Sequence, residues 1–172
     1  INQNEVNAKF SVGQGLKKFA VIHDTTDYGK GHNKYFSENL TKNGGQIVGT
    51  FGVTADQQDF NAELTKIKPL NADALYFGGL TPIGVRVRSQ MDKLGIKAHF
   101  VGTSGIMSDA FIEGLGPLAE GSLAFREGAP VDKLPGGKFF MEKYADAKYS
   151  EGVLRLTLPK QKGTAAHRLE VH

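Results

Sequence analysis

The chain has 172 residues, which is enough for one domain with a substantial core but short for two full domains. Hydrophobic residues make up 40% of it and charged residues 23%, and no apolar stretch approaches the roughly 18 residues of a membrane-spanning helix. The formal net charge of +3 comes without a cluster of Lys and Arg, which argues against a nucleic-acid partner. The absence of cysteine excludes disulfides, thiolate zinc sites and cysteine nucleophiles.

Strand and helix patterns alternate along the chain. Short apolar runs indicate buried strands, and segments with apolar residues at helical spacing indicate amphipathic helices. In chain order we predict a strand at 18–24, a helix at 29–42, a strand at 46–53, a helix at 59–68, a strand at 74–77, a helix at 82–95, a strand at 99–102, a helix at 109–115, a strand at 121–125 and a helix at 138–148. The last segment, 153–172, alternates on both sides of a KQKG turn signal and predicts a β-hairpin.

The alternation of strands and helices with short connections predicts right-handed βαβ units and a mostly parallel sheet with helices on both faces. The predicted fold class is therefore α/β, doubly wound. We expect residues 1–152 to form a single α/β lobe. Residues 153–172 would then be either a hairpin that completes the lobe or a foreign tail.

Three polar segments that contain glycine follow predicted strands. They are HDTTDYGKG at 23–31, FGGLTP at 77–82 and VGTSG at 101–105. In parallel α/β sheets, ligands bind outside the carboxyl ends of the strands. We therefore expect these segments to line one edge of the sheet together.

A phosphate site or a metal site fits these segments poorly. DYGKG has glycines at a strand-to-helix turn, but it matches neither GxxxxGK[ST] nor GxGxxG, and glycines that tighten the turn explain it better. His23 and Asp24 are adjacent on a strand and point to opposite faces, and the other histidines form no HxxxH or HxH pattern. No metal site is expected.

A serine nucleophile is also disfavoured. GTSG is one residue short of the GxSxG elbow, and a loop serine that caps a helix beginning near Ser108 explains the segment as well. Tyr28, Thr81, Thr103 and Ser104 are neutral hydrogen-bonding groups, and no paired carboxylates or His–acid couple suggests proton transfer. This edge suits recognition of a ligand better than catalysis, so neither an enzyme activity nor a cofactor is expected.

Several motifs taken together are specific to a family. These are KKFAVIHDTTDYGKG, KPLNADALYFGG, QMDKLGIKAHFVGTSG and GAPVDKLPGGKFFMEKYADAKY. In order and spacing they closely resemble the second lobe of the branched-chain amino acid (Leu/Ile/Val) binding proteins, the type I periplasmic solute receptors of ABC importers. The resemblance covers about residues 5–150 and implies a Rossmann- or flavodoxin-like lobe that closes with a first lobe around a small ligand.

The resemblance implies four ligand-binding residues. Tyr28 matches the aromatic residue that lines the ligand from this lobe, and Gly79 and Leu80 lie where a second aromatic contact often follows two glycines. Ser104 occupies a loop position that is often an acid, which pairs with the ligand α-amino group. The implied ligand is a small amino acid or an amide, bound weakly because that acid is missing.

The resemblance also implies partners outside this chain. The first lobe would supply the contacts to the ligand α-carboxylate, and an ABC permease would receive the solute. The parent protein would be periplasmic or extracellular. No signal peptide is visible, since Ile1 opens a polar segment. The chain also lacks an initiating Met, so a mature, trimmed or excised piece is expected.

A lone lobe offers only half of a cleft, whereas good sites bury most of a small ligand. We therefore expect impaired binding, and the exposed lobe interface favours a possible homodimer. The alternatives are a ligand-sensing receptor ectodomain, an engineered stand-alone folding scaffold and, least favoured, a flavodoxin-like or hydrolase enzyme.

Overall fold

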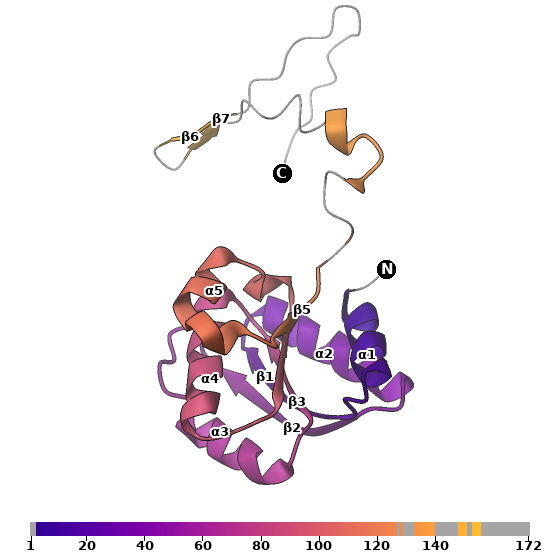
Figure 1. The fold of residues 1–172 in the computed structure, drawn as a ribbon, viewed down its shortest axis with the longest axis vertical. Coiled ribbons are helices and arrows are strands. Elements are labelled where there is room, and N and C mark those ends of the chain that lie inside the picture. Colours follow the sequence, from indigo (N-terminus) through magenta and orange to yellow (C-terminus); the bar gives the residue numbers. More distant parts are fainter. Residues whose placement is uncertain (1–2, 127, 129–132, 140–147, 151–152, 156–172) are drawn as a thin grey trace, which may run out of the picture. The chain divides into compact units, whose positions relative to one another are not determined.

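Five parallel strands form the sheet of the first of two compact units (Figure 1). The computed structural model describes residues 3–126, 128, 133–139, 148–150 and 153–155, and the units are Ile1–Gly128 and Ala129–His172. The strands are β1 (Lys18–Asp24), β2 (Gln46–Val53), β3 (Ala74–Gly78), β4 (His99–Gly102) and β5 (Leu123–Ala124). Their order is β2-β1-β3-β4-β5 and each neighbouring pair is parallel. The predicted α/β class with a parallel sheet is confirmed.

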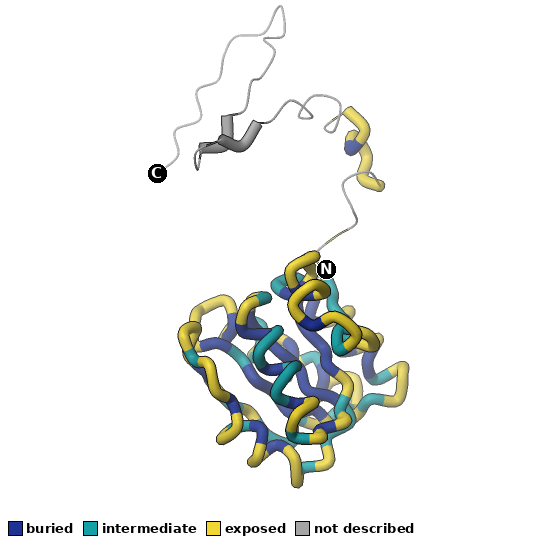
Figure 2. The backbone as a smooth tube through the Cα atoms, turned by 60° about the vertical axis from the view of Figure 1, so that its left-hand side comes forward, coloured by how far each residue is buried: buried dark blue, intermediate teal, exposed yellow. Residues whose placement is uncertain are grey.

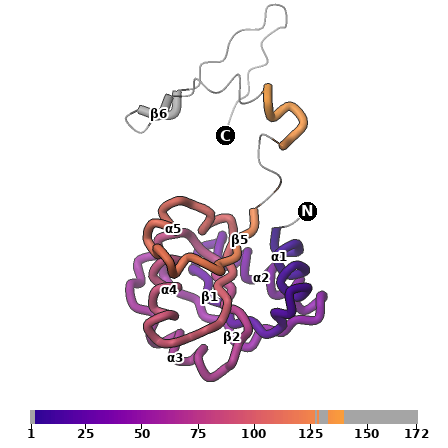
Figure 3. The backbone as a smooth tube through the Cα atoms, in the orientation of Figure 1, coloured from indigo at the N-terminus to yellow at the C-terminus, as the bar shows by residue number. Residues whose placement is uncertain are grey.

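Helices cover both faces of this sheet, as the double winding requires (Figure 1). One face carries α1 (Gln3–Gly13) and α2 (Asp27–Lys42), and the other carries α3 (Asn61–Ile67), α4 (Thr81–Lys93) and α5 (Asp109–Leu115). The described part of the first unit also contains the short 3-10 helices η1 (Lys68–Leu70), η2 (Ser104–Ile106) and η3 (Gly116–Ala119). Figure 3 shows the chain path, with the indigo α1 beside α2. The sequence patterns gave no prediction for α1.

Alternate residues of the central strands divide the core into two layers, because successive side chains of a strand point to opposite faces. Ala20, Ile22, Leu75 and Phe77 pack under α3, α4 and α5, whereas Phe19, Val21, Ala74 and Tyr76 pack under α1 and α2. The side chains of Ala74, Leu75, Tyr76 and Phe77 in β3 are fully buried, and in Figure 2 the dark blue buried residues gather at the centre of the unit. This two-layer core holds the strand ends in fixed register.

Local signals decide where the helices that flank the site begin and end. Thr26 caps α2, because its side chain accepts a hydrogen bond from the Gly29 N–H. Gly44 follows α2 with a φ of +84°, a left-handed conformation that favours glycine. Pro82 lies in the first turn of α4, where its missing N–H costs nothing. The loops between β1 and α2 and between β3 and α4 are consequently short.

The described residues of the second unit include β6 (Lys148–Ser150) and β7 (Val153–Arg155), which pair antiparallel. Most of the predicted helix at 138–148 lies outside the described residues, and Lys148 belongs to β6 instead. The predicted hairpin at 153–172 lies outside them from residue 156 onward, and Val153–Arg155 pairs with the strand before it. The division into 1–152 and 153–172 stays a prediction. None of the helices in the described parts of the chain is long and apolar enough to cross a membrane.

Candidate functional site

The three loops at the carboxyl edge of the sheet meet at the side chain of Thr103. The Tyr28 hydroxyl, from the first turn of α2, donates a hydrogen bond to Thr103 Oγ1 at 3.0 Å. Thr103 Oγ1 in turn donates to the Gly79 carbonyl at 3.4 Å and accepts from the Gly105 N–H at 3.1 Å. Thr103 is fully buried. The expectation that HDTTDYGKG, FGGLTP and VGTSG line one edge is confirmed.

Two glycines allow these loops to approach each other closely. A Cβ atom on Gly29 would lie 2.4 Å from the Asp24 carbonyl oxygen and 2.7 Å from the Gly78 carbonyl oxygen. A Cβ atom on Gly105 would lie 2.4 Å from the Gly79 carbonyl oxygen. These distances are shorter than any side chain tolerates, so the glycine in DYG and the one in TSG are needed for the packing of backbone on backbone.

The polar residues at the end of β1 hold the loop that follows it. Asp24 is buried, and its carboxylate accepts hydrogen bonds from both the backbone N–H and the hydroxyl of Thr26. The Nδ1 atom of His23 lies 2.7 Å from the Asp24 carbonyl oxygen and donates to it. Among the described residues, no group of three His, Asp or Glu side chains is placed to hold a metal ion. His23 and Asp24 therefore shape the edge of the sheet.

The structure brings the four predicted ligand-binding residues to this edge. Tyr28 is 36% exposed and Leu80 is 53% exposed, so both present side-chain surface to solvent. Gly79 contributes the carbonyl that accepts from Thr103, and Ser104 begins η2 directly after that residue. Their spacing supports a shared site, but their role in binding stays a prediction.

A second threonine ties the β3–α4 loop to the loop after β4. Thr81 Oγ1 donates to the Gly105 carbonyl at 2.9 Å and lies 2.9 Å from Ser108 Oγ. Ser108 Oγ accepts a hydrogen bond from the Phe111 N–H and caps α5. The prediction that a loop serine caps a helix beginning near Ser108 is confirmed, and that serine is Ser108 itself.

Sequence reasoning missed the side chains that lie behind Tyr28. The His32 ring packs against the Tyr28 ring with the centroids 4.3 Å apart. His32 lies between Gln3 and Asn4 of α1, which are 5% and 3% exposed. The only sequence signal for these buried polar side chains was the helical spacing of polar residues at positions 3, 4, 7 and 11. Such a pattern ordinarily indicates a helix face exposed to solvent.

Tyr76 extends this polar cluster into the core. Its hydroxyl donates to Asn4 Oδ1 at 2.8 Å, and its ring stacks on Phe36 with the centroids 3.7 Å apart. Burial, and secondarily the proximity of Tyr28, raises the pKa of Tyr76 well above its usual value. The Tyr76 hydroxyl is therefore a fixed hydrogen-bond donor at neutral pH.

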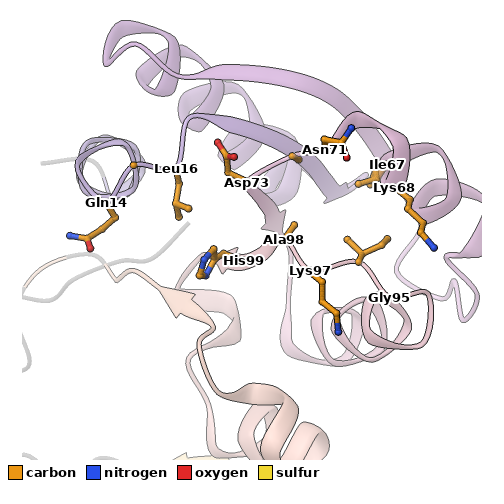
Figure 4. Close-up of a pocket in the computed structure, with 13 residues that line it drawn as sticks. Gln14, Leu16, Ile67, Lys68, Asn71, Asp73, Gly95, Lys97, Ala98 and His99 are labelled. Atoms are coloured by element: carbon orange, nitrogen blue, oxygen red, sulfur yellow. The ribbon is translucent and has the colours of Figure 1, made fainter.

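A cavity of about 620 Å³ lies at the opposite, amino edge of the sheet (Figure 4). Its carboxylate, Asp73, accepts hydrogen bonds from the N–H groups of Lys17 and Lys18 at 2.8 Å each, and these bonds lower the pKa of Asp73. Lys68 directly follows α3, where a cation complements the helix dipole. These charges serve the fold, so we place the candidate site at the carboxyl edge.

Comparison with known proteins gives a consistent result. A family model described as "Periplasmic binding protein" matches residues 2–157. An amino acid binding protein of Pseudomonas aeruginosa is 36% identical over 129 residues, which are 74% of this chain and 34% of that protein. A Leu/Ile/Val-binding protein of Citrobacter freundii is 30% identical, with 71% of this chain and 33% of that protein covered.

Solved structures agree with the sequence matches. The crystal structure of a leucine binding protein from Thermotoga maritima superposes with a TM-score of 0.73 at 27% sequence identity. The match covers 84% of this chain and 43% of that one. The chain spans about a third of the length of the two curated relatives described above.

Proposed function

Because the chain belongs to the periplasmic binding protein family, we propose that it is one lobe of an extracytoplasmic receptor that binds a small amino acid or amide for uptake by an ABC transporter. The observation that carries the proposal is the convergence of three loops on Thr103 at the carboxyl edge of the sheet. This convergence leaves Tyr28 and Leu80 partly open to a ligand. It is the edge at which parallel α/β sheets bind small molecules.

In the proposed site each of the four residues has a distinct role. The Tyr28 ring offers an aromatic wall, Leu80 an apolar contact, and Gly79 and Ser104 backbone or hydroxyl groups for hydrogen bonds. None of the four carries a charge that could pair with an ammonium group. The site therefore favours an amide, or an amino acid whose charges are met mainly by the first lobe.

The role is proposed to be binding without chemistry. Two facts support this: the Asp24 carboxylate is bonded to Thr26 and the His23 ring to the Asp24 carbonyl, and the relatives named above are amino-acid-binding proteins. In the complete receptor, closure of the two lobes would exclude water from the ligand. The proposed location is the periplasm or the cell exterior, and the proposed partners are a first lobe and an ABC permease. By itself the lobe would bind weakly and could form a homodimer through the surface that the first lobe covers.

The proposal is tested by adding a first lobe to this chain. The first lobe of the Pseudomonas aeruginosa relative is fused to this chain, and thermal melting is measured with each amino acid and small amide at millimolar concentration. A ligand present at about 100 times its Kd should raise stability by about 2.7 kcal/mol. Tyr28→Ala and Leu80→Ala should weaken the response, whereas Tyr35→Ala, at an exposed position of the same helix, should not. A folded fusion that responds to none of the compounds contradicts the proposal.

A further inference from the structure

A closed ring of contacts joins Tyr28 and Ser104 through the first turn of α1. The Tyr28 ring packs on the ring of His32, one helical turn later. The Nε2 atom of His32 lies 3.2 Å from Gln3 Nε2, and Gln3 Oε1 accepts the Ser104 N–H at 3.3 Å. Thr103, the chain neighbour of Ser104, accepts the Tyr28 hydroxyl and closes the ring.

Hydrogen-bond chemistry assigns one consistent set of donors and acceptors to these contacts. Asn4 Oδ1 accepts from the Tyr76 hydroxyl and lies 3.2 Å from His32 Nδ1. Because a carbonyl oxygen only accepts, Nδ1 of His32 carries the proton, and the neutral ring then presents an unprotonated Nε2. That atom accepts from the NH₂ group of Gln3, which turns the Gln3 oxygen toward Ser104.

Burial makes this orientation costly to change. Gln3 and Asn4 are 5% and 3% exposed, so a reversed amide would face another donor with little water to replace the lost bond. Gln3 therefore links the loop after β4 to α2 by a side chain whose two polar ends both face bonding partners.

We propose that Gln3 and His32 are positioning residues that hold Ser104 and Tyr28 at a fixed spacing from behind the ligand-facing edge. Neither needs to touch a ligand for this role. The consequence for binding rests on the proposed function: a site whose contacts are already in place loses less free energy to ordering when the ligand arrives.

Amide hydrogen exchange of the ligand-free chain tests the positioning directly. In Gln3→Met, which keeps the side-chain length and removes both polar ends, the Ser104 amide should exchange about five to ten times faster than in the wild type. The amides of β3 report global unfolding and should not accelerate by that factor. Lys9→Met, at an exposed position of α1, should leave Ser104 unchanged. Gln3→Glu, which keeps an acceptor oxygen, should restore much of the protection of Ser104.

Two results would overturn the proposal. One is an unchanged Ser104 amide in Gln3→Met, and the other is an equal acceleration of the Ser104 and β3 amides, which would mean that Gln3 only stabilises the fold. If Gln3→Met does not fold, the ¹⁵N spectrum of wild-type His32 at about pH 8 decides. A neutral His32 imidazole protonated at Nδ1 supports the proposed set of contacts, and protonation at Nε2 contradicts it.

Ligand titration separates this proposal from the proposed function. In the two-lobe fusion, Gln3→Met should weaken binding about fivefold to tenfold, whereas Lys9→Met should not. A fusion that binds no amino acid or amide, together with a faster Ser104 amide in Gln3→Met, would contradict the function and leave the positioning role intact. Tight wild-type binding that Gln3→Met does not change would contradict the positioning role in binding.

Discussion

The hydroxyl of Tyr28 donates a 3.0 Å hydrogen bond to the hydroxyl oxygen of Thr103, a residue 75 positions later in the chain. This contact joins the first turn of α2 to the loop after β4, and both belong to the edge where we place the ligand. Thr103 Oγ1 also bonds to Gly79 and Gly105, so a single buried hydroxyl holds three loops together.

We expect Thr103→Val to destabilise the chain by about 2–3 kcal/mol. The substitution preserves the shape of the side chain but leaves the Tyr28 hydroxyl, the Gly105 N–H and the Gly79 carbonyl without this partner. Urea unfolding monitored by circular dichroism measures the difference. Thr65→Val, at an exposed position of α3, serves as the control and should change stability by less than about 0.5 kcal/mol. A similar effect of both substitutions would contradict the role given to Thr103.

Two glycines of DYGKG should respond to alanine in opposite directions. In Gly29→Ala the new Cβ would lie 2.4 Å from the Asp24 carbonyl oxygen, so we expect a loss of about 3 kcal/mol or more. In Gly31→Ala nothing lies within 4 Å of the new Cβ, and helix propensity predicts a gain of about 0.5–1 kcal/mol. Paired denaturation curves test both. Equal effects would mean that backbone crowding at residue 29 is absent.

Asp73→Ala should lower stability at neutral pH and matter little in acid. The carboxylate accepts from the Lys18 and Lys17 N–H groups, and these bonds lower the pKa of Asp73. A carboxyl with a lowered folded-state pKa stabilises above its unfolded value of 3.8 and loses this contribution as the pH falls through the folded-state pKa. We expect a difference of about 1 kcal/mol at pH 7, since the group is partly exposed. Unfolding curves from about pH 7 to pH 2 should converge for the two proteins, whereas Glu38→Ala, an exposed control, should stay within about 0.5 kcal/mol of the wild type.

Tyr76→Phe should make the chain less sensitive to alkali. The raised pKa of Tyr76 means that the folded state keeps a proton that the unfolded chain releases near pH 10. The stabilising contribution of the neutral hydroxyl is complete below pH 10 and is lost as the pH rises through the folded-state pKa. The wild type should therefore lose stability more steeply above about pH 10 than Tyr76→Phe does, and Tyr35→Phe should retain the wild-type slope. Parallel slopes for all three proteins would contradict the environment assigned to Tyr76.

Strong hydrophobic patterns account for what the sequence predicts well. The strand KFAVIHD at 18–24 and the strand ALYF at 74–77 are apolar on both faces, as buried parallel strands are, and topology then brings their carboxyl ends together. The site loops could be located for the same reason. Their glycine content reflects real crowding between backbones.

Helix α1 could not be predicted from the same rules. It buries Gln3, Asn4, Asn7 and Ser11 and exposes Val6 and Phe10, which reverses the usual arrangement of an amphipathic helix. Its polar face is satisfied by partners distant in sequence, including His32, Tyr76 and Ser104. Hydrophobic periodicity carries no information about such partners. The part of the site that lies behind Tyr28 therefore emerged only from the structure.

The crowded glycines also show which positions at the carboxyl edge of the sheet tolerate substitution and which do not. At residues 29, 79 and 105 a methyl group would collide with carbonyl oxygens or with the Phe77 ring, so the loop backbones form a frame that substitution cannot easily move. Leu80 is 53% exposed and is not among these crowded glycines. If the proposed site is correct, a change of ligand selectivity is best sought by diversifying position 80, and then position 104, while the crowded glycines are kept.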